Sequence, residues 1–115
     1  MILYDDFKKI EIRAGKILSA EKIPETDKLI KLSVDFTEKS IEGISTPRQI
    51  VSGISMYFPD PAVLVGKTCM FVTNLEPRMI KGFESNGMLF AISDDKGNFS
   101  LLEPNSSIEP GTQAA

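Results

Sequence analysis

The chain has 115 residues and a mass of 12.7 kDa; 42% of its residues are hydrophobic, 25% are charged, and the formal net charge is −3. Such a composition is typical of one globular domain, here residues 1–115, and it excludes a two-domain enzyme and a disordered chain. The excess of acidic residues argues against a non-specific nucleic-acid binder, which normally has a basic balance.

Several residue types that catalysis commonly requires are missing. Histidine is absent, and Cys69 is the only cysteine. The commonest general base is therefore lacking, and one cysteine forms neither an intrachain disulfide nor a zinc site. No nucleophile elbow, P-loop or dinucleotide fingerprint occurs. We expect a protein without catalytic residues, metal or cofactor.

The N-terminal sequence MILYDDFKKI has acids where a signal peptide has basic and then apolar residues. No stretch approaches the roughly 20 apolar residues that a membrane span needs. We therefore expect a soluble, cytoplasmic protein with no membrane partner. The initial methionine favours a free-standing protein, although a cloned fragment can also begin with methionine.

Alternating apolar and polar residues predict six short strands. After a short acidic leader, the first covers residues 10–18 and contains Gly15, which indicates a bulge or bend where one strand can serve two sheets. A polar turn at 20–27 leads to the second strand, 28–36, in which the alternation is clearest. The other strands are expected at residues 48–54, 67–74, 88–93 and 99–102.

The connections between these strands indicate the fold. A long polar connection, 37–47, joins the second and third strands, and Pro59 and Pro61 favour one short helix ending at Gly66. Short strands without a crossover helix predict an all-β antiparallel barrel. A short helix between the third and fourth strands of a five-stranded Greek-key barrel is typical of the OB-fold, here with extra terminal strands. Only the tail SSIEPGTQAA is expected to fray.

The segment NLEPRMIKGFESNGMLF, residues 74–90, contains the densest set of candidate binding residues. Arg78 and Lys81 place two cations three residues apart beside glycines, which suits an anion site. Asn74 and Ser85 either hydrogen-bond a phosphate, a sugar hydroxyl or a base edge, or cap their own turns. Spacing alone favours a barrel loop whose glycines form corners.

Other candidates lie on the predicted strands. Met88 either offers a soft surface to a base or packs in the core. Lys28 and Lys31 on the second strand and Arg48 on the third form a basic stripe if these strands are adjacent. Since surface lysines without a role are common, the stripe is a hypothesis that depends on the register.

In sequence and order, these segments resemble the tRNA-binding domain family. The resemblance is carried by DFKKIEIRAGKI, DKLIKLSVDF, RQIVSGI and LVGKTCMFVTNLEPRMIKGFESNGML, and it extends from about Asp6 to Gly111. The family includes free-standing tRNA-binding proteins, C-terminal domains and beta-subunit forms of methionyl-tRNA synthetases, and the chaperone CsaA. The resemblance implies an OB-fold homodimer, joined partly through terminal segments, that binds tRNA by shape rather than sequence.

The resemblance also implies roles for particular residues. The sequence departs from the family's pattern at Ala14, where valine is common, at Asn86, where glutamine is common, and in an insertion around 41–45. Asn86 is the shorter amide and reaches less far toward a ligand. The positions that match the family's RNA-binding pattern are Lys28, Lys31, Arg48, Asn74, Arg78, Lys81, Ser85 and Met88.

An acidic chain binds RNA if its cations gather on one face, because charges beyond about 8 Å are screened at physiological ionic strength. We therefore predict structure-specific, sequence-independent tRNA binding by a homodimer, with methionyl-tRNA synthetase as a candidate partner. One alternative is a CsaA-like chaperone that binds unfolded polypeptides in an apolar groove of Met79, Ile80, Phe83 and Met88. Another is an architectural module that dimerises a synthetase and contributes only avidity.

Overall fold

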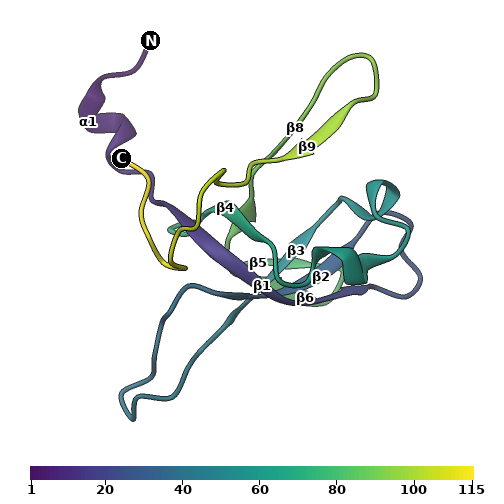
Figure 1. Ribbon diagram of the computed structural model, residues 1–115, viewed down its shortest axis with the longest axis horizontal. Coiled ribbons are helices and arrows are strands. Elements are labelled where there is room, and N and C mark those ends of the chain that lie inside the picture. The colour runs from purple at the N-terminus through teal and green to yellow at the C-terminus, as the bar shows by residue number, and fades with distance from the viewer.

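The computed structural model describes residues 1–115 and is built around one five-stranded antiparallel sheet (Figure 1). Around this sheet the strand order is β3-β2-β1-β4-β7. The strands are β1 (Ile12–Lys22), β2 (Ile30–Asp35), β3 (Arg48–Ser52), β4 (Thr68–Val72) and β7 (Met88–Leu89).

The remaining elements are short and lie between or outside these strands. A helix, α1, precedes the sheet, two 3-10 helices connect β3 to β4, and two hairpins follow β4. Their bounds are α1 (Tyr4–Phe7), η1 (Ser55–Tyr57), η2 (Pro61–Leu64), β5 (Arg78–Ile80), β6 (Phe83–Ser85), β8 (Ala91–Ser93) and β9 (Phe99–Leu101). Figure 1 shows that α1, the β2–β3 connection and the β8–β9 hairpin project away from the barrel. None of the helices is long and apolar enough to span a membrane.

The two edges of the sheet come together and nearly close it into a barrel. The backbone N–H of Asn86 donates to the Gln49 carbonyl at 2.8 Å, and the Val51 N–H donates to Ser85 Oγ at 3.0 Å. These bonds place the segment before β7 against β3. The expected all-β, five-stranded barrel of the OB type is therefore confirmed, with its short helical segment between β3 and β4.

Strand β1 belongs to both sides of the barrel, as Gly15 indicated. Its first part pairs with β4, from Ile12 opposite Val72 to Lys16 opposite Thr68, and its second part pairs with β2. The register shifts between Ile17 and Ser19, so the bulge lies three residues beyond the glycine. Bulges increase the local twist, which allows one strand to join two halves of a barrel.

The core lies inside this barrel and is apolar. In β2 the side chains of Ile30, Leu32 and Val34 are fully buried, and the alternate residues point outward as the pattern predicted. Phe36 and Phe71 meet edge to face with ring centroids 5.4 Å apart. Leu64, fully buried in η2, contributes to the same core cluster.

The structure differs from the expectations in four places. β1 continues to Lys22, through part of the predicted turn, because Lys22 pairs with Ile30. The expected loop after β4 contains the β5–β6 hairpin, and the expected acidic leader forms the short helix α1. The prediction that the tail frays is wrong: the Gly111 and Ala114 N–H groups donate to the carbonyls of Ala14 and Ile12, and the tail runs along β1.

We expect Gly15→Ala to lower the free energy of unfolding by about 1–3 kcal/mol, because overpacking of a filled core costs that much. A Cβ on Gly15 would lie 2.5 Å from Phe36 Cε1 and 2.6 Å from Val34 Cγ1. Gly53→Ala is the matched control, since a Cβ there meets nothing within 4 Å. Urea denaturation followed by circular dichroism measures both; equal stability of the two variants would contradict this role of Gly15.

Candidate nucleic-acid interface

The residues assigned to RNA binding gather around β2, β3 and two flanking segments. OB-folds bind oligonucleotides on the face of strands two and three and with the loops after strands one and four. In this chain those loops are residues 23–29 and 73–87. Lys28 lies in the first loop, Lys31 on β2, Arg48 at the start of β3, Asn74, Arg78, Lys81 and Ser85 in the second loop with its hairpin, and Met88 at the start of β7.

Lys31 and Phe83 form a contact between β2 and the β5–β6 hairpin. Lys31 points outward from β2, and its Nζ lies 5.0 Å from the centroid of the half-buried Phe83 ring. The same ammonium is 3.6 Å from a carboxylate oxygen of Glu21. The Gln49 side chain donates to the Glu84 carbonyl at 3.0 Å and so holds the β5–β6 hairpin against β3. The structure therefore brings Lys31 and this hairpin together.

Three of the assigned cations, Lys28, Arg78 and Lys81, are exposed and form no ion pair. The Lys28 carbonyl accepts a 2.9 Å hydrogen bond from the Ser55 N–H, which fixes its backbone. Lys81 lies in the turn of the β5–β6 hairpin. Their charged groups are available to an anionic partner from the solvent.

Arg48 has internal partners. Its Nε and Nη2 donate to the two carboxylate oxygens of Glu38, both at 2.8 Å, and its Nη1 donates to the Thr73 carbonyl at 2.6 Å. Arg13 donates from Nη2 to the same Glu38 carboxylate at 3.0 Å. Both guanidinium groups lie over the Phe36 ring, 5.2 and 5.4 Å from its centroid. We call Arg13, Glu38 and Arg48 the charged triad.

The electrostatics of this triad favour the ionised forms. The hydrogen bond from Arg48 holds the pKa of Glu38 below its ordinary value, although partial burial opposes the shift. The hydrogen bond to Glu38 likewise raises the pKa of Arg48. Only 16% of each arginine side chain is exposed, so the geometry is that of a partly buried, bidentate ion pair.

Asn74 and Ser85 also make internal hydrogen bonds. Asn74 accepts from the Glu11 N–H at 2.8 Å and donates to the Lys9 carbonyl, which ties the segment before β1 to the end of β4. Ser85 is buried, accepts from Val51 N–H and donates to the Gly87 carbonyl at 3.1 Å. Both side chains therefore hold backbone segments of the barrel together.

Of the four apolar residues of the alternative groove, two are exposed and two are half-buried. Met79 is 68% exposed and Met88 is 45% exposed, whereas Ile80 and Phe83 are half-buried. Exposed methionines are adaptable contact surfaces for apolar ligands. The structure thus offers some apolar area next to the cations, on the same segments.

Sequence reasoning missed Arg13 and Glu38 as members of a cluster. Arg13 looked like an ordinary outward residue of the first strand, and Glu38 like part of a polar connection. The available signal was the opposite charge of Glu38 and Arg48 on the two arms of one hairpin. The irregular connection between them hides the register, so their pairing could not be read from spacing.

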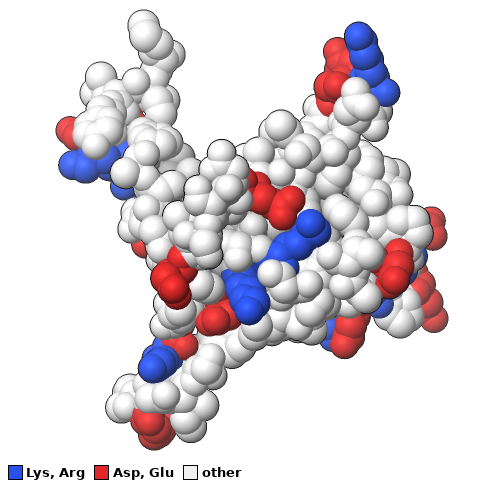
Figure 2. All heavy atoms as spheres, in the orientation of Figure 1, with Lys and Arg blue, Asp and Glu red and all other residues white.

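Charges of both signs are distributed over the molecule. On the face drawn in Figure 2, Lys and Arg side chains are interleaved with Asp and Glu, and they do not form a continuous basic patch there. On that face an anion would therefore meet local cations rather than a broad positive field.

The structure shows little that could hold a metal. No group of three or more His, Cys, Asp or Glu side chains is placed to hold a metal ion. Burial raises the pKa of the Cys69 thiol to about 11, so the thiol stays protonated at neutral pH.

Comparison with known proteins identifies the family. Residues 12–113 match the family described as "Putative tRNA binding domain", and the chain belongs to this family. It is 47% identical over 113 residues to a methionine–tRNA ligase of Methanoregula boonei and 39% identical over 112 residues to that of Porphyromonas gingivalis. These matches cover 98% and 97% of the chain but only 15% of each ligase, so the chain spans about 15% of the length of these curated relatives.

Solved structures have the same fold. A methionyl-tRNA synthetase (MetRS)-related protein of Pyrococcus horikoshii superimposes with a TM-score of 0.85 at 38% identity, with both chains covered completely. The CsaA chaperone protein of Picrophilus torridus gives a TM-score of 0.81 at 31% identity, also over the whole of both chains. The chain is therefore similar to synthetase-related proteins and to chaperones alike.

The charged triad predicts a stability that depends on pH. The pKa of Glu38 is lower in the folded than in the unfolded protein, so its contribution is present above the unfolded pKa and is lost as the pH falls through the folded pKa. Glu38→Gln should lower the free energy of unfolding at pH 7 by about 1–3 kcal/mol, since two arginines lose a charged acceptor.

The control is Glu76→Gln, which changes an exposed glutamate outside the triad. Urea denaturation between pH 3 and 7 should show a smaller loss of stability on acidification for Glu38→Gln than for the wild type. An unchanged pH profile would remove Glu38 from this role.

Proposed function

We propose that this chain, residues 1–115, acts as one non-catalytic domain that binds tRNA by its shape. The observation that carries the proposal is that Lys28, Arg78 and Lys81 are exposed, unpaired and located on the two loops that OB-folds use for nucleic acids. Membership of the tRNA-binding domain family supports it. Since the partner is tRNA, we place the activity in the cytoplasm.

Within this proposal the assigned residues have two kinds of role. Lys28, Lys31, Arg78 and Lys81 contact phosphates, and Met88 borders the contact surface. Arg48, Asn74 and Ser85 keep β3 and the second loop in position, because their hydrogen bonds are made inside the protein. Phosphate contacts position a protein without reading sequence, which agrees with recognition by shape.

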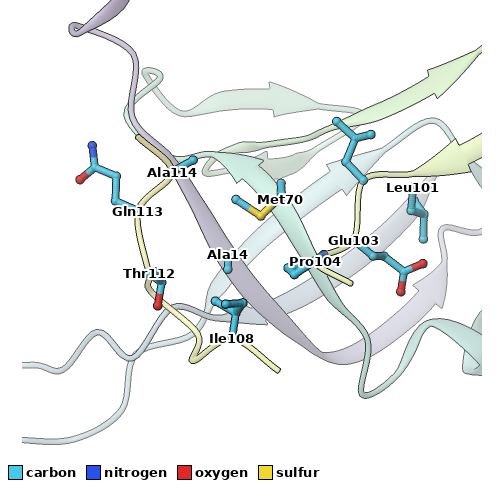
Figure 3. Close-up of a pocket in the computed structure, with 10 residues that line it drawn as sticks. Ala14, Met70, Leu101, Glu103, Pro104, Ile108, Thr112, Gln113 and Ala114 are labelled. Atoms are coloured by element: carbon cyan, nitrogen blue, oxygen red, sulfur yellow. The ribbon is translucent and has the colours of Figure 1, made fainter. Parts of the chain in front are cut away.

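We propose that the domain works as a homodimer joined through its terminal segments. Six of the first ten residues are exposed hydrophobics: Met1, Ile2, Leu3, Tyr4, Phe7 and Ile10. A largely apolar hollow of about 380 Å³ lies between β1, β4 and the C-terminal segment, lined by Ala14, Met70 and Ile108 among others (Figure 3). These six side chains and the hollow form the terminal apolar surface. A second copy would cover it, and the basic loops of that copy would double the number of available cations.

Methionyl-tRNA synthetase is the synthetase partner that the relatives suggest. The chain resembles a small part of methionine–tRNA ligases, and it resembles a MetRS-related protein over its full length. We propose that the domain adds tRNA affinity to such an enzyme, either within one longer chain or between separate chains. The added affinity would come from effective concentration rather than from new catalytic contacts.

The second candidate function is binding of unfolded polypeptides. The exposure of Met79 and Met88 beside the cations favours it, as does the similarity to CsaA. Titration of labelled tRNA and of a labelled unfolded polypeptide against the same protein separates the two. Binding of the polypeptide at a lower protein concentration than binding of tRNA would favour the chaperone function.

The salt dependence of binding tests the tRNA proposal. If about four phosphates are neutralised, the plot of log affinity against log salt concentration should have a slope of about −3 to −4. Arg78→Ala and Lys81→Ala should each weaken binding of every tRNA alike and flatten this slope by about 1. Electrophoretic mobility shifts with bulk tRNA at several salt concentrations measure both effects.

Lys96→Ala is the matched control, because Lys96 is an exposed lysine in the loop between β8 and β9, away from the interface. It should bind tRNA like the wild type. A salt-independent affinity, or equal losses for Lys96 and Arg78, would contradict the proposed interface.

The terminal apolar surface predicts the oligomeric state. Leu3 is 73% exposed, and Leu3→Glu should dissociate the dimer because a charge would be buried at the contact. Sedimentation velocity should show the wild type at twice the mass of the chain and Leu3→Glu at the monomer mass, with weaker tRNA binding. Ile41→Glu is the control, since Ile41 is fully exposed on the β2–β3 connection; a monomeric wild type would contradict the dimer.

A further inference from the structure

A hollow of about 490 Å³ lies between the β1–β2 connection and the β5–β6 hairpin. Apolar side chains of Ile23, Pro24 and Phe83 line it together with polar side chains of Glu25, Thr26 and Lys81. Its volume lies within the range of about 300–1,000 Å³ that small-ligand sites occupy. It is thus large enough for one nucleotide, and it lies in the cleft between the two loops described above.

The backbone holds both walls of this hollow in place. On one side Ile23 is buried, its N–H donates to the Leu29 carbonyl at 3.1 Å, and the Thr26 hydroxyl donates to the Ile23 carbonyl at 2.8 Å. On the other side the β5–β6 hairpin is paired from Arg78 to Ser85 and joined to β3. The site is therefore preformed.

Lys81 has an unfavourable backbone conformation at the rim of the hollow. Lys81 and Gly82 form the two-residue turn of the hairpin with φ values of 50° and 85°. A turn of this type favours Asn-Gly, and a lysine in the left-handed region is sterically disfavoured. Strain of this kind is commonly retained at functional sites. Here the strained residue lies in the turn that borders the hollow.

The lining matches the chemistry of a nucleobase attached to a phosphate. Phe83 supplies an aromatic surface for stacking, and the Lys31 ammonium 5.0 Å from its centroid holds the ring. Lys81 supplies a cation for the phosphate. The carboxylate of Glu25 would repel a phosphate inside the hollow, whereas it accepts hydrogen bonds from the amino group of a base.

We propose that this hollow binds one unpaired nucleotide of the RNA. The base stacks on Phe83 and donates its amino group to Glu25, while the adjacent phosphate pairs with Lys81 at the rim. Uracil alone among the four bases has no amino group, so the hollow prefers cytosine, adenine or guanine to uracil. The inference rests on the proposed RNA interface, and it adds a single-stranded contact that recognition by shape alone does not include.

The test uses the full chain and fluorescence anisotropy with four labelled RNAs: bulk tRNA, oligo(C) and oligo(U) of about eight nucleotides, and a blunt duplex of similar length. Phe83→Leu keeps an apolar side chain but removes the aromatic ring. It should weaken oligo(C) binding about fivefold or more and leave duplex binding unchanged. Phe83→Tyr keeps the aromatic ring and should bind oligo(C) like the wild type, whereas a loss of duplex binding in Phe83→Leu would indicate a structural role of the ring.

Glu25→Ala tests recognition of the base, with Glu42→Ala, an exposed glutamate on the β2–β3 connection, as its control. The preference for oligo(C) over oligo(U) should disappear in Glu25→Ala and persist in Glu42→Ala. Thermal unfolding by circular dichroism confirms that each variant is folded.

The outcomes separate this inference from the function on which it rests. Wild-type protein that binds tRNA while Phe83→Leu binds oligo(C) normally overturns the nucleotide site but keeps the tRNA proposal. Wild-type protein that binds none of the RNAs overturns both. Loss of unfolded-polypeptide binding in Phe83→Leu, with oligo(C) binding unchanged, would assign the hollow to a peptide and overturn the inference.

Discussion

The contact between Gly15 and Phe36 is the constraint on which the barrel depends. One strand, β1, pairs with β4 at one end and β2 at the other, and the large ring after β2 packs against the strand where the two halves meet. Only a residue without a Cβ leaves room there. The C-terminal tail reaches the same region, since Thr37 donates to the Pro110 carbonyl. The core, the sheet and the tail are thus joined around one aromatic side chain.

Both guanidinium groups of the charged triad lie over this ring, and the triad shows how the chain divides its cations. Arg48 donates two hydrogen bonds to the Glu38 carboxylate, and Arg13 donates a third. The planar guanidinium is suited to this geometry. The unpaired cations around the interface are mostly lysines, whose flexible point charges follow a phosphate backbone without fixed geometry. Two arginines therefore stabilise the barrel, while Lys28 and Lys81 remain available to a partner.

Sequence reasoning predicted the barrel well, because strand alternation and the glycine in β1 are local signals of burial and bending. It could not separate Arg48 from Arg78, since both are arginines next to strands. The Arg48 side chain pairs with Glu38 across an irregular connection, whereas Arg78 forms no ion pair with an acid. Likewise the polar tail gave no sign of pairing with β1. Contacts between distant segments decide these cases, and a single sequence contains no direct signal of them.

Strand β1 also links the two surfaces that the proposed function requires. Residues 12–14 bind the C-terminal tail beside the apolar terminal surface, and residues 19–22 pair with β2, whose outer face carries Lys31. A dimer formed at one end of this strand would therefore hold two interfaces in a fixed relation. Each interface has few unpaired cations, so a single copy would bind weakly. Two copies on one rigid frame would bind a tRNA of matching dimensions much more tightly than one with a different shape, because only the matching tRNA engages both at once.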